Sequence, residues 1–133
     1  MSGRERDPAA WVLKAEHDLL AIRSLIAGAI VPWDMVAFHA QQGAEKYLKA
    51  LLVLHEQVVP KVHDLERLLQ LCVATDPSLS QCVTDCRRLT QLGFVSRYPD
   101  NPDEPSERDA REAIRLAERI CDAVRPLLGS SNP

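Results

Sequence analysis

One short stretch of the chain places several hydrogen-bonding side chains on one side of a predicted helix. Residues 38–55 read FHAQQGAEKYLKALLVLH. At about 100° per residue, Gln42, Glu45 and Lys49 fall within a narrow arc. These side chains could hold a phosphate-bearing ligand or a partner. Alternatively, Glu45 and Lys49 could form an ordinary i,i+4 pair on a solvated face, which contributes only about 0.3–0.5 kcal/mol.

The same arc also contains an apolar residue. Phe38 lies within it, and Gln41 and Lys46 flank it on opposite sides. A helix with apolar residues on both sides packs against something on both sides. We therefore expect the arc to be half-buried by another helix or by a second subunit, and its long polar side chains to need partners, because an unpaired buried charge is costly.

A second candidate stretch is Lys61-Val62-His63-Asp64, at the entry to another predicted helix. His63 stands close to both a lysine and a carboxylate, so it could change its charge near neutral pH. Asp64 either belongs to the same site or caps the helix that follows, because an aspartate oxygen readily accepts hydrogen bonds from a first helical turn.

A third candidate stretch, SRYPD, occupies residues 96–100 of the only long irregular segment. Arg97 offers a fork of donors that suits phosphate or carboxylate, and Tyr98 offers a ring for stacking on a base. Alternatively, Arg97 anchors this segment through a salt bridge to Glu45 or to a carboxylate of the last helix. These readings predict that Lys46, Lys49 and Arg97 converge on one cationic recess, which would hold phosphates through charge-assisted hydrogen bonds.

The elements that must position these residues are predicted to be helices, since Ala, Leu, Glu and Arg are plentiful and apolar residues recur every three or four positions. An aspartate before a proline marks two helix starts, and Ser106 with Asp109 resembles a capping box. The predicted helices run from Asp7-Pro8 to about Gly28, from Trp33 to Glu56, from His63-Asp64 through Cys72, from Asp76-Pro77 to Gly93, and from Ser106 to an end marked by Pro126 and Gly129.

Composition sets the class of protein. The 133 residues are 46% hydrophobic and 26% charged, which is typical of one globular domain and unlike a disordered chain. We expect an all-α, up-and-down antiparallel bundle of four main helices plus a short one, spanning residues 1–133 with frayed termini at 1–6 and 129–133. The four cysteines are expected to be reduced, buried apolar side chains without a metal: Cys72, Cys82, Cys86 and Cys121.

Several functions are disfavoured by what the sequence lacks. No apolar run approaches the roughly 18 residues of a membrane span, and the first residues do not resemble a signal peptide, so we expect a cytoplasmic protein without a membrane partner. A net charge of −3 argues against a large uniform nucleic-acid footprint but leaves room for a local basic pocket. There is no glycine-rich phosphate loop or set of metal-binding carboxylates, so nucleotidyl transfer by this chain alone is not expected.

Five stretches, taken in order, resemble the HEPN family (higher eukaryotes and prokaryotes nucleotide-binding domain), in its stand-alone prokaryotic form, which is similar to the C-terminal domain of sacsin. The first combines Trp11 with Ala15 and Asp18-Leu19. The others are FHAQQGAEKYLKALL, VHDLERLL, SRYPD and SERDAREAIRLAERI. Each stretch alone is weakly specific, but the five cover nearly the whole chain in the family's order.

The resemblance implies a homodimeric helical bundle that binds a nucleotide such as ATP or GTP and serves as the partner or substrate-binding subunit of a minimal nucleotidyltransferase. It implies no cofactor. The family's polar signature falls on these positions: Gln42, Glu45, Lys46, Lys49, His63, Asp64, Arg97, Tyr98 and Asp100.

Other HEPN members are ribonucleases or toxins that carry an arginine followed four to six residues later by histidine. This sequence has no such pair. Cleavage of RNA needs a base for the 2′-hydroxyl proton and a cation for the phosphate, so the resemblance favours a non-catalytic module, with nucleic-acid binding left open. The main alternative is an interaction or dimerisation scaffold in which the same polar residues are structural.

Overall fold

The computed structural model describes residues 3–93, 99 and 105–129, and within these residues every regular element is a helix. The predicted all-α class is therefore confirmed. In chain order the elements are η1 (Gly3–Arg6), α1 (Pro8–Ile26), α2 (Trp33–Leu54), α3 (Leu65–Val73), η2 (Pro77–Cys82), α4 (Val83–Gly93) and α5 (Glu107–Gly129), where η denotes a 3-10 helix.

The predicted helix starts are confirmed at three places. The Asp7 carboxylate accepts a hydrogen bond from the Ala9 amide at 3.0 Å, with proline at the first helical position. Asp64 caps α3 in the same way, so its alternative role as a helix cap is the one the structure shows. At α5, Ser106 and Asp109 exchange backbone-to-side-chain hydrogen bonds as a capping box.

The end of α2 is two residues earlier than predicted. The Gln57 amide donates to the Leu52 carbonyl at 2.8 Å and the Glu56 amide donates to Val53 at 3.0 Å. This pair of bonds is a Schellman motif. It requires a left-handed residue after the helix cap, and Glu56 takes this conformation with a φ of 56°.

Two other predicted boundaries differ. The helix expected from Pro77 to Gly93 begins as the 3-10 segment η2, because the Asp76 carboxylate is engaged by His55 and Thr75 instead of capping the first turn. Of the two residues predicted to mark the end of α5, Gly129 is its last residue, whereas Pro126 lies inside the helix, since the following Leu127 and Leu128 pack against the core.

Of the N-terminal residues 1–6 that are expected to fray, Gly3–Arg6 form η1, and residues 1–2 lie outside the described part of the chain. The Asp7 amide donates to the Arg4 carbonyl at 3.1 Å. The Trp11 indole Nε1 donates to the Glu5 carbonyl at 3.0 Å, which ties this short helix to α1.

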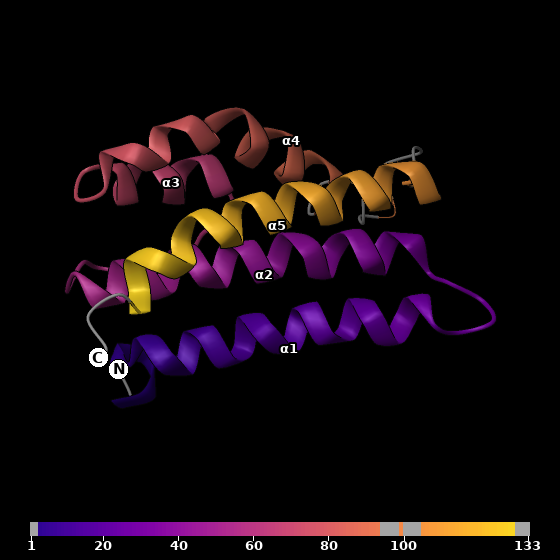
Figure 1. The fold of residues 1–133 in the computed structure, drawn as a ribbon, viewed down its shortest axis with the longest axis horizontal. Coiled ribbons are helices and arrows are strands. Elements are labelled where there is room, and N and C mark those ends of the chain that lie inside the picture. The colour runs from indigo at the N-terminus through magenta and orange to yellow at the C-terminus, as the bar shows by residue number, and fades with distance from the viewer. Residues whose placement is uncertain (1–2, 94–98, 100–104, 130–133) are drawn as a thin grey trace.

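The helix α2 occupies the middle of the molecule. It contacts α1, α3, α4 and α5. Figure 1 shows α1 along one side of it, with α5 and the shorter α3 and α4 on the other. Helices of the same chain therefore contact α2 on both sides. Within the polar arc, Glu45 and Lys49 are buried by this packing.

The core forms where these helices meet, and the small residues of α2 let its neighbours approach closely. Ala37, Ala40 and Ala44 are fully buried. At the end of α4, a Cβ added to Gly93 would lie 2.4 Å from the Gln41 Cβ and 2.5 Å from the Ala37 carbonyl oxygen. Only a glycine fits such a contact.

The four cysteines are free and buried, as predicted. Burial raises the pKa of the Cys72 and Cys121 thiols to about 12, so these thiols are protonated and unreactive at neutral pH. Among the described residues, no helix is long and apolar enough to cross a membrane.

Candidate functional site

Glu45 is the centre of a polar cluster inside the bundle. Glu45 is only 3% exposed to solvent. Its Oε1 accepts hydrogen bonds from Gln41 Nε2 at 3.1 Å and from His63 Nδ1 at 3.0 Å, and its Oε2 accepts from Lys49 Nζ at 2.9 Å. Gln41 Nε2 also donates to the His63 carbonyl at 3.0 Å, so α2 and the segment before α3 are joined by several bonds.

Lys49 forms the predicted i,i+4 pair with Glu45, but the pair is buried and not solvated. The Lys49 side chain is 8% exposed. Its ammonium also lies 5.9 Å from the centre of the Trp11 ring on α1, a distance at which a cation is attracted to an aromatic face. We refer to Gln41, Glu45, Lys49, His63 and Trp11 as the Glu45 cluster.

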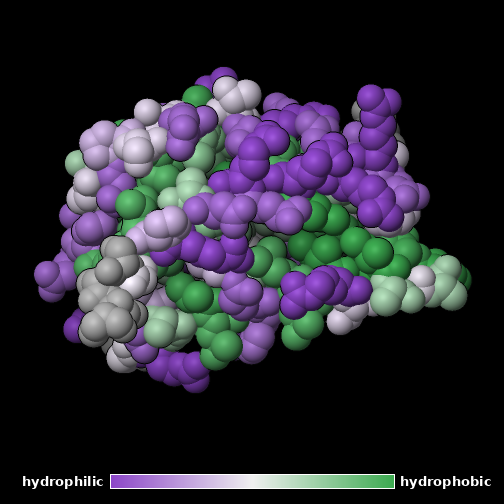
Figure 2. Space-filling model, in the orientation of Figure 1, coloured by the Kyte–Doolittle hydropathy of each residue, from purple (hydrophilic) through white to green (hydrophobic). Residues whose placement is uncertain are grey.

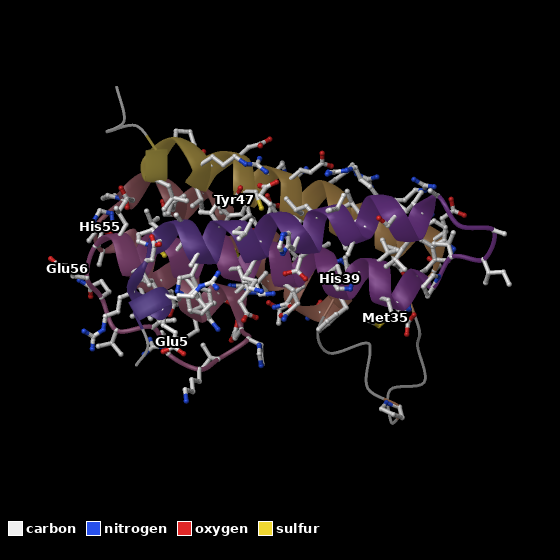
Figure 3. All side chains as sticks on the ribbon, turned by 90° about the horizontal axis from the view of Figure 1, so that it is seen from below. Glu5, Met35, His39, Tyr47, His55 and Glu56 are labelled. Carbon is white, nitrogen blue, oxygen red and sulfur yellow. The ribbon has the colours of Figure 1, made fainter. Side chains whose placement is uncertain are left out.

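Lys46 belongs to a different cluster, between α1 and α2. Its Nζ lies 2.6 Å from Asp18 Oδ2, and His39 Nδ1 lies 2.8 Å from Asp18 Oδ1. Asp18 is buried. Its two partners from α2 compensate the charge of its carboxylate. Figure 3 labels His39 on α2, in a view from the α1 side of the molecule.

These contacts change the expected cationic recess. Lys46 is paired with Asp18 and Lys49 with Glu45, so neither lysine presents a free charge to a phosphate. The two lysines help to hold the helices together, and any ligand at this site must find its free hydrogen-bonding groups elsewhere.

Two such groups are the side-chain oxygens of adjacent glutamines. Gln41 Oε1 and Gln42 Oε1 are buried and have no hydrogen-bond partner in the described part of the chain. A buried acceptor without a partner costs about 1–3 kcal/mol, and such groups in a native fold call for an explanation. Oxygens of this kind can accept a hydrogen bond from a ligand amine or hydroxyl.

The Glu45 cluster reaches the surface at His63. The His63 side chain is 48% exposed, whereas that of its partner Glu45 is 4% exposed. Asp64 follows immediately, and its carboxylate is used to cap α3. The cluster therefore has a solvent-accessible edge at His63 and a buried interior.

Of the nine predicted site residues, the structure brings Glu45, Lys49 and His63 together and places Gln42 on the same helix. Lys46 is paired with α1, and Asp64 caps α3. The remaining three lie outside the described residues: Arg97, Tyr98 and Asp100.

Sequence reasoning did not assign Asp18 and His39 to a site. A signal was available, because His39 and Lys46 are seven residues apart and therefore share one side of α2. That both would meet Asp18 depends on how α1 packs, which no local pattern shows.

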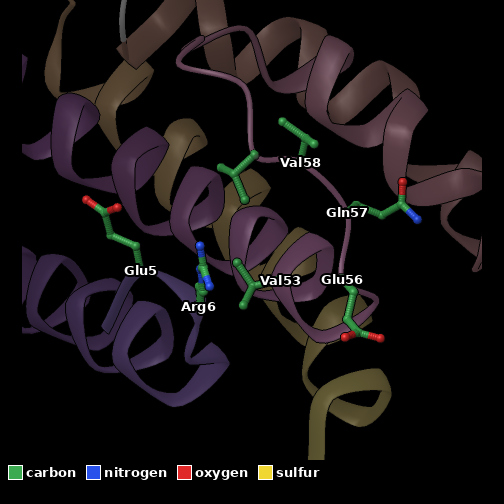
Figure 4. Close-up of a pocket in the computed structure, with 7 residues that line it drawn as sticks. Glu5, Arg6, Val53, Glu56, Gln57 and Val58 are labelled. Carbon is green, nitrogen blue, oxygen red and sulfur yellow. The ribbon is translucent and has the colours of Figure 1, made fainter. Parts of the chain in front are cut away.

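Two surface hollows lie near the Glu45 cluster, at the end of the bundle where α2 finishes. One, of about 180 Å³, includes Trp11 and Lys14 in its wall. The other, of about 330 Å³ and drawn in Figure 4, is lined by Glu5, Arg6, Val53, Glu56, Gln57, Val58 and Val59. Glu5 contributes to both walls, so the two hollows adjoin across η1.

A separate cluster ties α1, α2 and α5 together around Tyr47. The Tyr47 hydroxyl donates to the Glu16 carboxylate, and Arg125 Nε donates to the same hydroxyl at 3.1 Å. Burial, reinforced by the Glu16 carboxylate, raises the pKa of Tyr47 to about 12. The hydrogen bond from Tyr47 lowers the pKa of Glu16.

Among the described residues, no group of three or more His, Cys, Asp or Glu side chains could hold a metal ion. The fold and site thus define an all-helical domain with a buried polar cluster on its central helix. A model of the HEPN domain matches residues 9–127, and the chain belongs to this family. Searches of curated proteins and of solved structures returned no match.

Proposed function

We propose that this chain is a non-catalytic HEPN module that binds a nucleotide, ATP or GTP, and serves as the partner subunit of a minimal nucleotidyltransferase. The observation that supports this proposal is the Glu45 cluster, with its accessible edge at His63 and the unmet acceptors of Gln41 and Gln42. Membership of the HEPN family supports a nucleotide as the class of ligand and a nucleotidyltransferase as the class of partner.

The chain offers a distinct role for each group. Glu45 and Lys49 are positioning residues, because their charges satisfy each other and hold Gln41 and His63 in place. The amino group of a base or a ribose hydroxyl would donate to Gln42 Oε1. The phosphate contact and the stacking ring are assigned to Arg97 and Tyr98, as the sequence suggests.

The absence of catalysis is proposed on chemical grounds. An RNase of this family would need a histidine four to six residues after an arginine, and the full sequence has no such pair. In the proposed complex, the chemistry belongs to the nucleotidyltransferase and this chain supplies recognition.

A structural brace is the second candidate. It is favoured by the saturation of Glu45, which already accepts from three side chains. If the cluster is a structural brace, Gln42 binds no ligand. Replacing its buried polar group by an apolar one of similar size would then be neutral or stabilising, with no other effect.

Calorimetric titration with ATP and GTP tests the proposal. We expect the wild type and an Arg67→Ala control, which removes an exposed arginine of α3, to bind alike. Arg97→Ala should bind roughly tenfold more weakly or worse, because a hydrogen bond to a charged group contributes about 1.5–3 kcal/mol.

Gln42→Leu separates the two candidates. If Gln42 belongs to a nucleotide site, the substitution should weaken ATP or GTP binding and leave the melting temperature unchanged or higher. If it belongs to a structural brace, the substitution should not change ATP or GTP binding. If millimolar nucleotide produces no heat with the wild type, the nucleotide proposal is abandoned.

A further inference from the structure

The outer side of α5 carries a row of arginines that the Glu45 cluster does not involve. At about 100° per residue, Arg108, Arg115 and Arg119 fall within about 40° of one another on the helix, and Arg111 lies beside them. All four side chains are exposed. Figure 2 shows hydrophilic residues in a band over α5 on this face. We call these four residues the α5 arginine row.

Each carboxylate that forms an ion pair at this row binds a single arginine. Glu107 accepts from Arg111 at 2.9 Å. Glu112 is held through two hydrogen bonds by Arg88 of α4. Asp85 of α4 is held in the same way by Arg119, at 2.9 Å for both bonds.

These pairings leave Arg108 and Arg115 without an ion pair in the described ranges. Glu118 lies one turn beyond Arg115 but forms no ion pair with it. The Trp33 ring is engaged by a member of the row, since the Arg111 guanidinium lies 5.2 Å from the centre of this ring. Within the described residues, the row therefore offers two guanidinium groups that form no ion pair.

Two open hollows lie at the same two arginines. One, of about 450 Å³, is lined by Glu107, Arg108, Arg111 and Arg115. The other, of about 360 Å³, is lined by Arg108, Glu112, Arg115, Leu116 and Arg119. Arg108 and Arg115 belong to both walls, and the lining carries four arginines against two glutamates, although the whole chain has a net charge of −3.

The spacing of the two unpaired arginines suits a repeated anion. They are seven positions apart in the sequence, which corresponds to about 10.5 Å along α5. A guanidinium binds phosphate oxygens through two parallel hydrogen bonds. A free nucleotide carries its phosphates consecutively, whereas a nucleic-acid strand repeats them over such a distance.

We propose that the α5 arginine row binds the phosphate backbone of a single-stranded nucleic acid, with Arg108 and Arg115 making the phosphate contacts. Arg111 and Arg119 border these contacts, and their charges are compensated by Glu107 and Asp85. Recognition is expected to be independent of base sequence, because phosphate contacts carry no sequence information. The inference does not depend on the proposed nucleotide site.

Fluorescence anisotropy with a labelled oligouridine RNA of about 20 nucleotides tests this inference across a salt series starting near 50 mM. The variant Arg108→Ala/Arg115→Ala is compared with Arg23→Ala/Arg67→Ala, which removes two exposed arginines from α1 and α3. The two variants have the same net charge, so a general charge effect would be equal in both. All four side chains are exposed, and melting curves check that both variants fold.

We expect the Arg108→Ala/Arg115→Ala variant to bind the RNA at least tenfold more weakly at low salt. Its slope of log affinity against log salt should fall by roughly 1.4, because each phosphate contact on a single strand contributes about 0.7. The control should stay within twofold of the wild type.

Three outcomes would overturn the inference: no binding by the wild type at low salt, an equal loss in both variants, or equal affinity for uridine 5′-monophosphate and the 20-nucleotide RNA. The last result would mean that a lone phosphate group suffices. ATP titration of the same variants should be unaffected, which keeps this test distinct from that of the nucleotide site.

Discussion

At the scale of single residues, the most informative feature is the number of polar groups buried between the helices. The Glu45–Lys49 pair has the spacing of a surface pair worth a few tenths of a kcal/mol. In its buried setting, removal of one partner would leave an uncompensated charge and cost about 3–5 kcal/mol. Three donors on Glu45 and two on Asp18 show how the fold compensates these charges.

Tyr47 gives a residue-scale prediction about pH. The folded state holds its pKa at about 12, above the ordinary value of 10. Its contribution to stability is therefore fully present below pH 10 and is lost as pH rises toward 12. In a Tyr98→Phe background, where Tyr47 is the only tyrosine, ultraviolet titration should show ionisation near pH 12 in the native protein and near pH 10 in denaturant.

The Tyr47→Phe variant is the control, and its free energy of unfolding should no longer decline in this way over the alkaline range. A native titration midpoint at the ordinary tyrosine value would contradict the hydrogen-bonded, buried geometry.

At the scale of elements, the contact between α4 and α2 decides where the Glu45 cluster sits. Gly93 at the end of α4 packs directly against the Ala37 backbone and the Gln41 side chain. Gln41 in turn donates to Glu45 and to the His63 carbonyl. The position of α4 is therefore coupled to the cluster through one glycine contact.

Gly93→Ala should lower the free energy of unfolding by about 1–3 kcal/mol, the usual cost of inserting atoms into a packed core. Alanine is the better helix former by about 1 kcal/mol, so a loss would show that the steric clash dominates. Chemical denaturation measures the change.

Two other glycines provide graded comparisons for this test. Gly129→Ala should be nearly neutral, since nothing lies within 4 Å of the added Cβ. Gly43→Ala should be intermediate, because its nearest neighbour is the flexible Leu19 side chain at 3.1 Å. Equal stability of all three variants would refute the close approach of α4 to α2.

At the scale of the whole molecule, the arrangement changes the argument for a dimer. The sequence suggested one because α2 is apolar on two sides, but the chain's own helices cover both sides. The large apolar side chains that remain exposed include Leu13 at 46% and Leu20 at 50%, on α1. They are seven residues apart and therefore lie on one side of that helix.

We expect a homodimer that pairs through this side of α1. Light scattering should give about twice the monomer mass of 14.8 kDa for the wild type. Leu13→Glu/Leu20→Glu should give the monomer mass, because two buried charges without partners would oppose association.

Val58→Glu is a suitable control for the dimer test, since Val58 is an exposed apolar residue outside α1, and this variant should remain dimeric. A monomeric wild type at micromolar concentrations would contradict the expected dimer.

Much of the fold follows from local patterns. Asp7-Pro8, Asp64 and the Ser106–Asp109 box mark helix starts because their side chains bond to amides within three residues. The η2 segment escaped prediction because the Asp76 carboxylate binds His55, 21 residues away. The Schellman turn was missed because Glu56 occupies a position where glycine is the usual signal.

The sequence by itself determined the helices, their apolar faces, the buried cysteines and the family, since these depend on residues close along the chain or on a recognisable order of motifs. It also predicted the Glu45–Lys49 pair, whose members share one helix. Only the tertiary structure decided that Lys46 pairs with Asp18 and that Glu45 meets His63, across 28 and 18 residues. The reason is that the partner of a charged side chain depends on which helix packs beside it, and many residues contribute jointly to that packing.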